Sequence, residues 1–225
     1  MNIKLSSEKL DQLDLAETLS KGLELFQKKP IKLCLVIFVG FLVSVFSLGI
    51  LMGVMFTNFF RITKKIDEDT EGLYEPQVSD LFQRMDKFVD CFILGLMIFG
   101  LIVLFHVTFY IIGLSDTFFA RFVALSLATP IYILSFQIIA NDDDSSALDA
   151  LKETLEVIKN APSKALGFGA ILGVLASVPS ILGTFLGFIV STLTYAFSIS
   201  AGRKFFNAVN ETTIVEEIKP TEEVQ

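Results

Sequence analysis

Four long apolar runs, almost free of charge, limit what this chain can fold into. The first covers residues 33–60 and the last covers residues 165–201, and neither contains a charged residue. Between them lie two further runs, residues 88–114 and 117–140. Because a helix needs about 20 apolar residues to cross a bilayer, every run is long enough to span one. The sequence therefore predicts an integral membrane protein.

The composition agrees with this prediction and excludes several other classes of protein. Hydrophobic residues make up 52% of the 225 residues and charged residues 19%, against about 25% charged in a soluble domain. The net charge of −7 argues against a basic surface for nucleic acid. Two cysteines, in or beside apolar runs, do not suggest a disulfide framework. Residues 1–30 are rich in charge and do not resemble a signal peptide.

The first and last runs are too long for one span, and each has helix-breaking residues near its middle. At about 1.5 Å per residue, one helix over the 37 residues of the last run would reach roughly 55 Å, against a hydrocarbon core of about 30 Å. Pro179 and Gly183 interrupt the last run, and Gly49 interrupts the first. These breaks predict helical hairpins over residues 31–63 and 165–203.

The positions of lysine and arginine determine the expected topology. Residues 1–32 carry six of these cations, residues 61–87 five, and residues 141–165 and 203–225 three each. Cytoplasmic loops are rich in lysine and arginine. A topology of six spans places all four cation-bearing segments on the cytoplasmic side, so six spans are favoured over four. We therefore expect an all-α, polytopic bundle of about six transmembrane helices in a prokaryotic cell membrane, with both termini cytoplasmic. For the first run, a re-entrant hairpin or a single span stays an alternative to a full hairpin.

Three cytoplasmic segments have the pattern of amphipathic interfacial helices. Asp14 and Glu17 form a capping-box pattern, Ser146 with Asp149 can begin another helix, and Ser79 a third. Such helices lie along the headgroups or pack on the base of a bundle, and the alternative is a docking face for a soluble partner. Their apolar positions at helical spacing are Leu15, Leu19, Leu23 and Phe26; Phe82, Met85, Val89 and Phe92; and Leu148, Leu151, Leu155 and Ile158.

The expected organisation has three parts. Residues 1–30 form a cytoplasmic segment with an amphipathic helix, residues 31–206 a membrane bundle, and residues 207–225 a disordered acidic tail. Within the bundle the expected order is hairpin 31–63, span 88–114, span 117–140, interfacial helix 146–160 and hairpin 165–203.

Several short motifs, taken in order, resemble a known family. Residues 25–30 read Leu-Phe-x-Lys-Lys-Pro, residues 49–53 Gly-Ile-Leu-Met-Gly, and residues 147–155 Ala-Leu-x-Ala-Leu-Lys-Glu-Thr-Leu. Together with Arg121-Phe122 and the Gly-rich final run, they resemble a broad family of prokaryotic multi-pass membrane proteins. That family is similar to the membrane-anchor domain of glycerophosphodiester phosphodiesterases. The resemblance implies about six spans and supplies no catalytic residue, and no phosphodiesterase domain is expected in this chain.

His106, Asp116 and Arg121 are the candidate functional residues. His106 is the only histidine and lies within an apolar run, where an ionisable residue suggests proton or ion handling. The alternative is a neutral imidazole that hydrogen-bonds between helices. Asp116 and Arg121 flank the outer connection and either pair across it or stay solvated. No metal or cofactor is expected, since one histidine without neighbouring ligands cannot complete a tetrahedral zinc site.

Other notable residues have simpler interpretations. The acidic clusters at residues 67–71 and 142–144 lack the EF-hand spacing and are expected to be solvated loops. Cys34 and Cys91 are expected to be free thiols. Glycines four residues apart permit close helix contacts, and they occur at Gly49/Gly53, Gly169/Gly173 and Gly183/Gly187.

Three functions are compatible with these features. The leading hypothesis is a non-enzymatic structural, scaffold or accessory protein, since the sequence shows interfacial helices but no recognisable catalytic set. The second is a channel or small-solute transporter, because broken apolar runs are a feature of transporters. The third is a lipid-handling protein, which the anchor-domain resemblance implies. The expected partners are the lipid bilayer and either a further copy of the chain or another subunit of a membrane complex.

Overall fold

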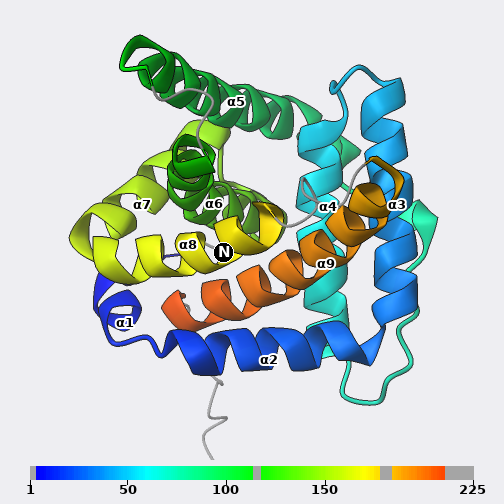
Figure 1. Ribbon diagram of the computed structural model, residues 1–225. Coiled ribbons are helices and arrows are strands. Elements are labelled where there is room, and N and C mark those ends of the chain that lie inside the picture. The colour runs from blue at the N-terminus through cyan, green and yellow to red at the C-terminus, as the bar shows by residue number, and fades with distance from the viewer. Residues whose placement is uncertain (1–3, 114–117, 178–183, 211–225) are drawn as a thin grey trace, which may run out of the picture.

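The computed structural model describes residues 4–113, 118–177 and 184–210. All regular structure in these ranges is helical, so the all-α prediction is confirmed. Figure 1 shows the helices gathered around α6, with α5 along one edge and α2 along the opposite edge. The α-helices are α1 Ser7–Asp11, α2 Leu15–Lys28, α3 Pro30–Phe46, α4 Met52–Glu68, α5 Phe88–Ile111, α6 Phe118–Asn141, α7 Ala147–Asn160, α8 Pro162–Ser177 and α9 Thr184–Val209, with 3₁₀ helices η1 Val78–Phe82 and η2 Met85–Lys87.

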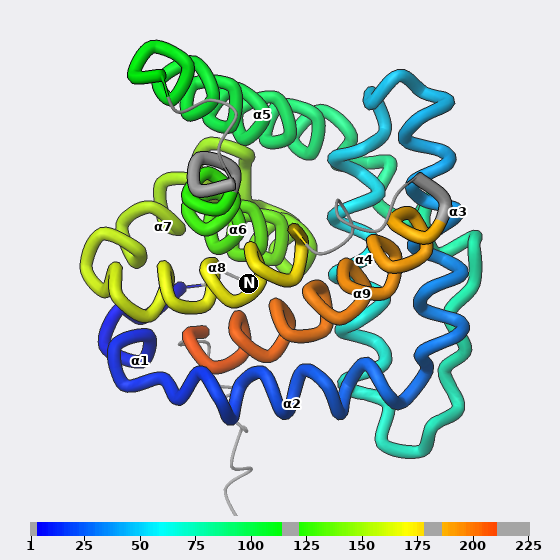
Figure 2. The backbone as a smooth tube through the Cα atoms, viewed as in Figure 1, coloured from blue at the N-terminus to red at the C-terminus, as the bar shows by residue number. Residues whose placement is uncertain are grey.

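The chain reverses direction between α3 and α4 at residues 47–51. Leu48 and Gly49 have φ angles of +53° and +83°, in the left-handed region that glycine adopts without steric cost. The amide of Gly49 donates to the carbonyl oxygen of Ser44 at 2.7 Å, which closes the end of α3. Figure 2 shows the resulting pair of adjacent helices.

A right-angled corner joins α2 to α3, whose axes differ by 89°. The expected cap of α2 is confirmed, because Asp14 Oδ1 accepts the amides of Ala16 and Glu17 at 2.8 and 3.2 Å. On its inner side α2 packs directly on α9. A Cβ on Gly22 would lie 2.6 Å from the Cα of Ala201, so the two backbones are almost in contact.

Aromatic rings fill the space between α4, α6 and α9. The ring of Phe56 lies 5.9 Å from Tyr132, 5.7 Å from Phe136 and 5.6 Å from Tyr195, between centroids. These separations are those of favourable aromatic pairs. The apolar window of α6 is 72% buried, which makes this helix the centre of the described structure.

Small residues allow α8 to pack tightly against α6. A Cβ on Gly169 would overlap the carbonyl oxygen of Ser126, and one on Gly173 would lie 3.2 Å from the Ser126 hydroxyl oxygen. Gly53 makes a similar approach to the backbone of Cys91, between α4 and α5. Close helix contact at these glycines is therefore confirmed within the chain, whereas Gly49 lies in a turn and Gly183 lies outside the described residues.

Fewer helices than expected are long and apolar enough to cross a membrane. By length and composition, two described segments qualify, Val78–Ile111 and Phe122–Asn141, and a third if α2 and α3 form one bent span. The prediction of six exceeds this number. One reason is length, since α3 has 17 residues and α8 has 16, or about 24–26 Å against a core of about 30 Å.

The last apolar run forms two helices, α8 and α9, that point in roughly opposite directions in Figure 1. The predicted turn residues Pro179 and Gly183 lie outside the described residues. The predicted start of the disordered tail at residue 207 is wrong, because α9 continues to Val209. Its last turn is held by contacts with α4 and the N-terminal segment. Residues 211–225 lie outside the described residues.

The predicted interfacial helix beginning at Ser79 is also wrong. Residues 78–87 form two short 3₁₀ helices, and the N-cap of the first is Gln77 rather than Ser79. The Asp80 carboxylate accepts the Gln77 amide at 3.0 Å, and this contact caps the first 3₁₀ helix, which begins at Val78. An α-helix begins only at Phe88.

The two remaining amphipathic helices bury small residues together with part of their apolar stripes: Leu25 of α2 is buried, and Leu15, Leu19 and Phe26 of α2 and Leu151 and Ile158 of α7 are partly buried against the core. In α7, whose predicted cap Ser146 is confirmed, Leu148 and Leu155 are about half exposed. In α2, Leu23 is likewise exposed. These three exposed leucines are therefore free to contact lipid headgroups. The buried positions are Ala147, Ala150, Thr154 and Val157 in α7 and Thr18, Gly22 and Leu25 in α2.

The contact of α6 with α8 gives a first prediction. Gly169→Ala should lower the free energy of unfolding by about 1–3 kcal/mol, because a methyl group in a filled contact forces the backbones apart. The matched control is Gly100→Ala, where a Cβ meets nothing within 4 Å. Thermal unfolding in detergent, followed by circular dichroism, measures both variants. Equal midpoints for the two would contradict the close contact.

Candidate functional site

A buried arginine lies where the ends of α4, α6 and α9 meet. Arg203 of α9 is 6% exposed there. Its Nε lies 3.6 Å from Asp67 Oδ2, its Nη2 3.4 Å from Glu68 Oε1, and its Nη1 3.4 Å from Asn141 Oδ1. Lys204 also pairs with Asp67. We call these five residues the polar base, and they join the ends of α4, α6 and α9.

The polar base holds buried charge in a paired state. Three side chains of α9 contact the Asp67 carboxylate. Besides Arg203 and Lys204, Asn207 Nδ2 donates to its Oδ2 at 2.9 Å. The expectation that residues 67–71 form a solvated loop is therefore wrong for Asp67, whose side chain is 10% exposed. Burying an unpaired arginine would cost several kcal/mol. The partners of Arg203 thus fix how α9 meets its neighbours.

A second ion-pair group ties the segment before α5 to the connection between α6 and α7. Arg84 is 4% exposed, pairs with Asp143, and places its Nε 3.6 Å from Asp86 Oδ1. Lys87 Nζ donates to the carbonyl oxygen of Ser145 at 3.3 Å. Asp143 belongs to the acidic cluster at residues 142–144 and its side chain is largely exposed, so this cluster anchors a loop while Asp143 also remains in contact with solvent.

Asp80 fastens the same segment to α4. Its carboxylate accepts the Tyr74 hydroxyl at 2.7 Å, the Gln77 amide at 3.0 Å and the Lys65 ammonium at 3.2 Å. Burial raises the pKa of Asp80, but these three donors outweigh it and the net pKa is lowered. Asp80 therefore stays ionised at neutral pH and holds residues 74–83 in place.

The N-terminal segment crosses the same end of the molecule. Residues 5–13, which we call the strap, are held to α9 by the Ser6 amide, which donates to the Val209 carbonyl oxygen at 2.8 Å. The Leu5 amide donates to Glu153 Oε1 on α7 at 2.6 Å. Lys164 Nζ on α8 donates to the Leu13 carbonyl oxygen at 2.8 Å. The strap thus connects three helices.

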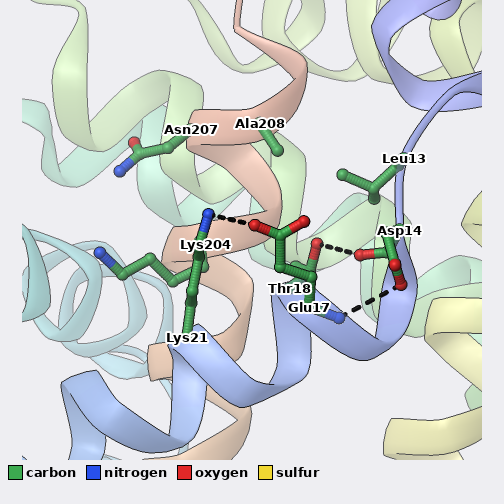
Figure 3. A pocket seen from close by; sticks show the side chains of 8 residues that line it. All are labelled: Leu13, Asp14, Glu17, Thr18, Lys21, Lys204, Asn207 and Ala208. Carbon is green, nitrogen blue, oxygen red and sulfur yellow. Dashed lines mark hydrogen bonds and ion pairs between the residues drawn. The ribbon is translucent and has the colours of Figure 1, made fainter.

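Two shallow clefts flank the strap. The first, of about 310 Å³, lies between the start of α2 and the end of α9 and is shown in Figure 3. The charges on its α2 side are paired locally, since Lys21 Nζ lies 2.6 Å from Glu17 Oε1. The second cleft, of about 690 Å³, lies between the strap and α7, and Lys152 and Glu156 help to line it. Both clefts are open hollows at the surface, lined by polar and apolar side chains.

The residues predicted from the sequence do not meet at this end. His106 lies on the exposed side of α5, and its Nδ1 is 2.9 Å from the Ile102 carbonyl oxygen of the same helix. The interpretation of His106 as an interhelical hydrogen-bonding residue required its imidazole to face the bundle, and it does not. Asp116 and the side chain of Arg121 lie outside the described residues. Cys34 and Cys91 are free thiols, as expected.

The buried ionic residues of this end were not singled out from the sequence. Arg203 follows directly on a charge-free run, and Asp67 lies within an acidic cluster. The sequence predicts Arg203 only as one of the cytoplasmic cations and Asp67 only as part of a solvated loop. A signal was present in the polar residues Arg203, Lys204 and Asn207, which recur at one-turn spacing beyond the apolar run. Their partners on α4 are about 135–140 positions away in sequence, so no local pattern pairs them.

Comparison of the chain with protein-family models, with curated proteins and with solved structures found no match. The candidate site is therefore interpreted from its own geometry. The resemblance to the membrane-anchor family stays a prediction based on the motifs.

A second prediction concerns Arg203. Arg203→Leu should lower the free energy of unfolding by about 1.5–3 kcal/mol, because it removes one of the three groups that hold the buried Asp67. The control is Lys21→Gln, whose ion pair with Glu17 is exposed and should cost less than about 1 kcal/mol. Thermal unfolding in the same detergent measures both. A loss for Arg203→Leu no larger than the control would refute the structural role of the polar base.

A third prediction concerns pH and Glu153. Burial raises the pKa of Glu153, the nearby Asp142 and Glu156 charges raise it further, and the Leu5 amide acts in the opposite direction. Because the folded protein binds this proton more tightly than the unfolded chain, the Glu153 contribution to stability falls as pH rises through the raised pKa.

Glu153→Gln should therefore raise the melting temperature at pH 8 and flatten its decrease between pH 5 and pH 8. The amide oxygen of glutamine can still accept the Leu5 amide. Glu24→Gln, on the exposed side of α2, is the control and should leave the pH profile unchanged. Melting temperatures measured across this pH range check the prediction. Identical pH profiles for both variants would show that ionisation of Glu153 does not destabilise the folded protein.

Proposed function

We propose that the protein is an integral protein of the cell membrane that acts as a structural scaffold or accessory subunit rather than as an enzyme. In this proposal the chain crosses or enters the membrane with about six helical segments, both termini are cytoplasmic, and the polar base faces the cytoplasm. The presence of two or three helices that are apolar enough to span supports membrane insertion.

The observation that carries the proposal is the apolar outer surface of α3. Its outward side chains recur at alternating spacings of four and three residues and are 36–82% exposed. Soluble proteins rarely expose a continuous apolar stripe of this length, whereas a bilayer covers one. The residues of the stripe are Ile31, Leu35, Phe38, Leu42 and Val45.

The corner between α2 and α3 supports the same orientation. If α3 enters the bilayer, the angle of 89° lays α2 along the membrane surface. The exposed Leu23 of α2 then meets the acyl boundary, while Lys28 and Lys29 lie at headgroup level, as in interfacial amphipathic helices. The half-exposed Leu148 and Leu155 give α7 a similar character.

The packed interior favours a scaffold over the channel alternative. The rings of Phe56, Tyr132, Phe136 and Tyr195 fill the space between α4, α6 and α9, where a pathway through the described helices would have to lie. The clefts lie at the surface beside the strap. A scaffold uses such a rigid interior to present fixed surfaces to lipid and to other proteins.

The sidedness of the chain tests this proposal. In a Cys34→Ala, Cys91→Ala background, Glu71→Cys and Ser145→Cys should react with a membrane-impermeant maleimide only after the cells are permeabilised. The control is Leu48→Cys, in the turn at the other end of the α3–α4 hairpin, which should react from outside if the hairpin crosses completely.

Labelling of Glu71→Cys or Ser145→Cys in intact cells would overturn the proposed topology. Failure of Leu48→Cys to react from outside, with the other two still protected, would identify α3 and α4 as a re-entrant hairpin. Proton or potassium flux into liposomes containing the purified protein, above that of protein-free liposomes, would contradict the scaffold and favour the channel.

A further inference from the structure

The turn between α3 and α4 exposes apolar side chains where a soluble protein usually places polar ones. Leu48 is 90% exposed and Phe46 is 84% exposed, with Val45, Ile50 and Met52 exposed beside them. Leu48 also has a φ angle of +53°, a left-handed conformation that glycine or asparagine adopts at less cost. A turn that displays leucine in a strained conformation points to a functional contact with an apolar partner.

The outer side of α5 lies level with this turn. Figure 1 shows α5 crosswise to the α3–α4 hairpin, at the end of the hairpin that carries the turn. The two elements meet there, since a Cβ on Gly53 would overlap the backbone of Cys91. The apolar window of the segment Val78–Ile111 is only 17% buried. The turn and the outer side of α5 therefore face the same way, and the 24 residues of α5 alone extend this surface over about 36 Å.

The exposed side chains of α5 point away from the bundle. The buried residues of this helix, which include Cys91 and Ile98, share one side of it. At about 100° per residue, three exposed residues at spacings of seven lie on the opposite side. These residues are Leu96, Val103 and Tyr110.

Charged side chains limit how far this surface can enter a bilayer. Asp86 and Asp143, whose side chains are 65% and 84% exposed, pair with Arg84. Arg84 lies close enough to Arg61 of α4 for the two charges to interact. Arg61 is 12 positions from Gly49 in the turn, or roughly 18 Å along the helix. Since exposed carboxylates are excluded from hydrocarbon, the hairpin can enter to about the depth of one leaflet, half of a core of about 30 Å.

We propose that the α3–α4 turn and the outer side of α5 form one embedded face, which enters a single leaflet while α5 lies in the plane of the membrane. The inference rests on the proposed membrane insertion and specifies the re-entrant form of the α3–α4 hairpin. The partner is lipid, because one flat apolar layer covers both surfaces at once. The embedded face comprises Phe46, Leu48, Leu96, Val103 and Tyr110.

The opposite orientation, in which α5 crosses the bilayer, leaves the turn uncovered. The hairpin would then lie parallel to the membrane, with its turn end beside the start of α5. Lys87 and Asp90 pair at that start, 3.7 Å apart, and such charges stay at headgroup level. Leu48 would therefore face headgroups and water, although it is the most exposed large apolar side chain of the turn.

The positions of α2 and the polar base are compatible with the embedded face. Both lie at the other end of the hairpin from the turn. The 17 residues of α3 place α2 about 25 Å from the turn. With about 18 Å of the hairpin inserted, a headgroup layer of about 5–7 Å accommodates α2. The amphipathic α2 thus stays at the headgroups, and the polar base stays on the cytoplasmic side.

Depth measurements on the full chain test the embedded face. In the Cys34→Ala, Cys91→Ala background, nitroxide labels are attached to Leu96→Cys, Val103→Cys or Tyr110→Cys in liposomes of phosphatidylcholine and phosphatidylglycerol. Collision rates with oxygen and with a water-soluble nickel chelate then report the depth of each label. The three labels should lie at nearly the same depth. A crossing α5 would instead spread them over about 21 Å, at 1.5 Å for each of 14 positions, and that result would overturn the proposal.

The turn is tested in the same liposomes. A label on Leu48→Cys should lie at least as deep as those on α5, and Phe46→Cys replaces it if that variant does not insert. The matched control is Leu73→Cys, which is also an exposed leucine but lies beside Lys29 at the other end of the hairpin. Its label should be fully accessible to the nickel chelate. Equal accessibility of the Leu48 and Leu73 labels, with the α5 labels in lipid, would reject the embedded face.

The outcomes separate this inference from the proposed function. With an impermeant maleimide, Leu48→Cys should remain unlabelled both in intact and in permeabilised cells. Labelling from outside would show a hairpin that crosses completely, which refutes the embedded face but leaves the membrane scaffold intact. Labels on α5 and on the turn that all reach the nickel chelate as freely as the Leu73 label would refute membrane insertion itself, and with it both proposals.

Discussion

Arg203 imposes the strictest requirement on this structure, because a guanidinium that is 6% exposed must find its counter-charges within the protein. It finds them on α4, in Asp67 and Glu68, and a polar partner on α6, in Asn141. The register of three helices is thereby set at one end. The strap crosses the same end, so the first and last described segments of the chain close the bundle together.

Away from the polar base, small residues make the closest contacts between helices, as at Gly22 against Ala201 and Gly169 against Ser126. Large side chains such as Phe59 and Phe168 fill the core, whereas Leu148 and Phe99 point outward. In water the outward side chains would contribute no hydrophobic stabilisation. In a bilayer lipid covers them at no cost, and close backbone contact adds packing energy.

Features that depend on residues close together in sequence could be predicted, whereas contacts between residues far apart in sequence could not. The caps at Asp14 and Ser146 depend on residues within one turn, so both could be identified. The pairing of Asp67 with Arg203 joins positions 136 residues apart and has no local pattern. The pattern after Ser79 predicts an amphipathic helix. In the structure Asp80 accepts hydrogen bonds from Tyr74 and Lys65, which favour a tighter turn.

Counting spans from composition has a physical limit, which α4 illustrates. Its second half carries Arg61, Lys64 and Lys65, so it does not qualify as a lipid-facing span. Ten of its 17 residues are nevertheless buried, because α3, α5, α6 and α9 pack around it. A helix insulated by protein needs no continuous apolar surface, and its charges are satisfied by neighbouring helices, as Lys65 is by Asp80. Apolar composition therefore identifies the helices that are able to face lipid, and α5, which the described part of the chain leaves largely uncovered, is the clearest of these.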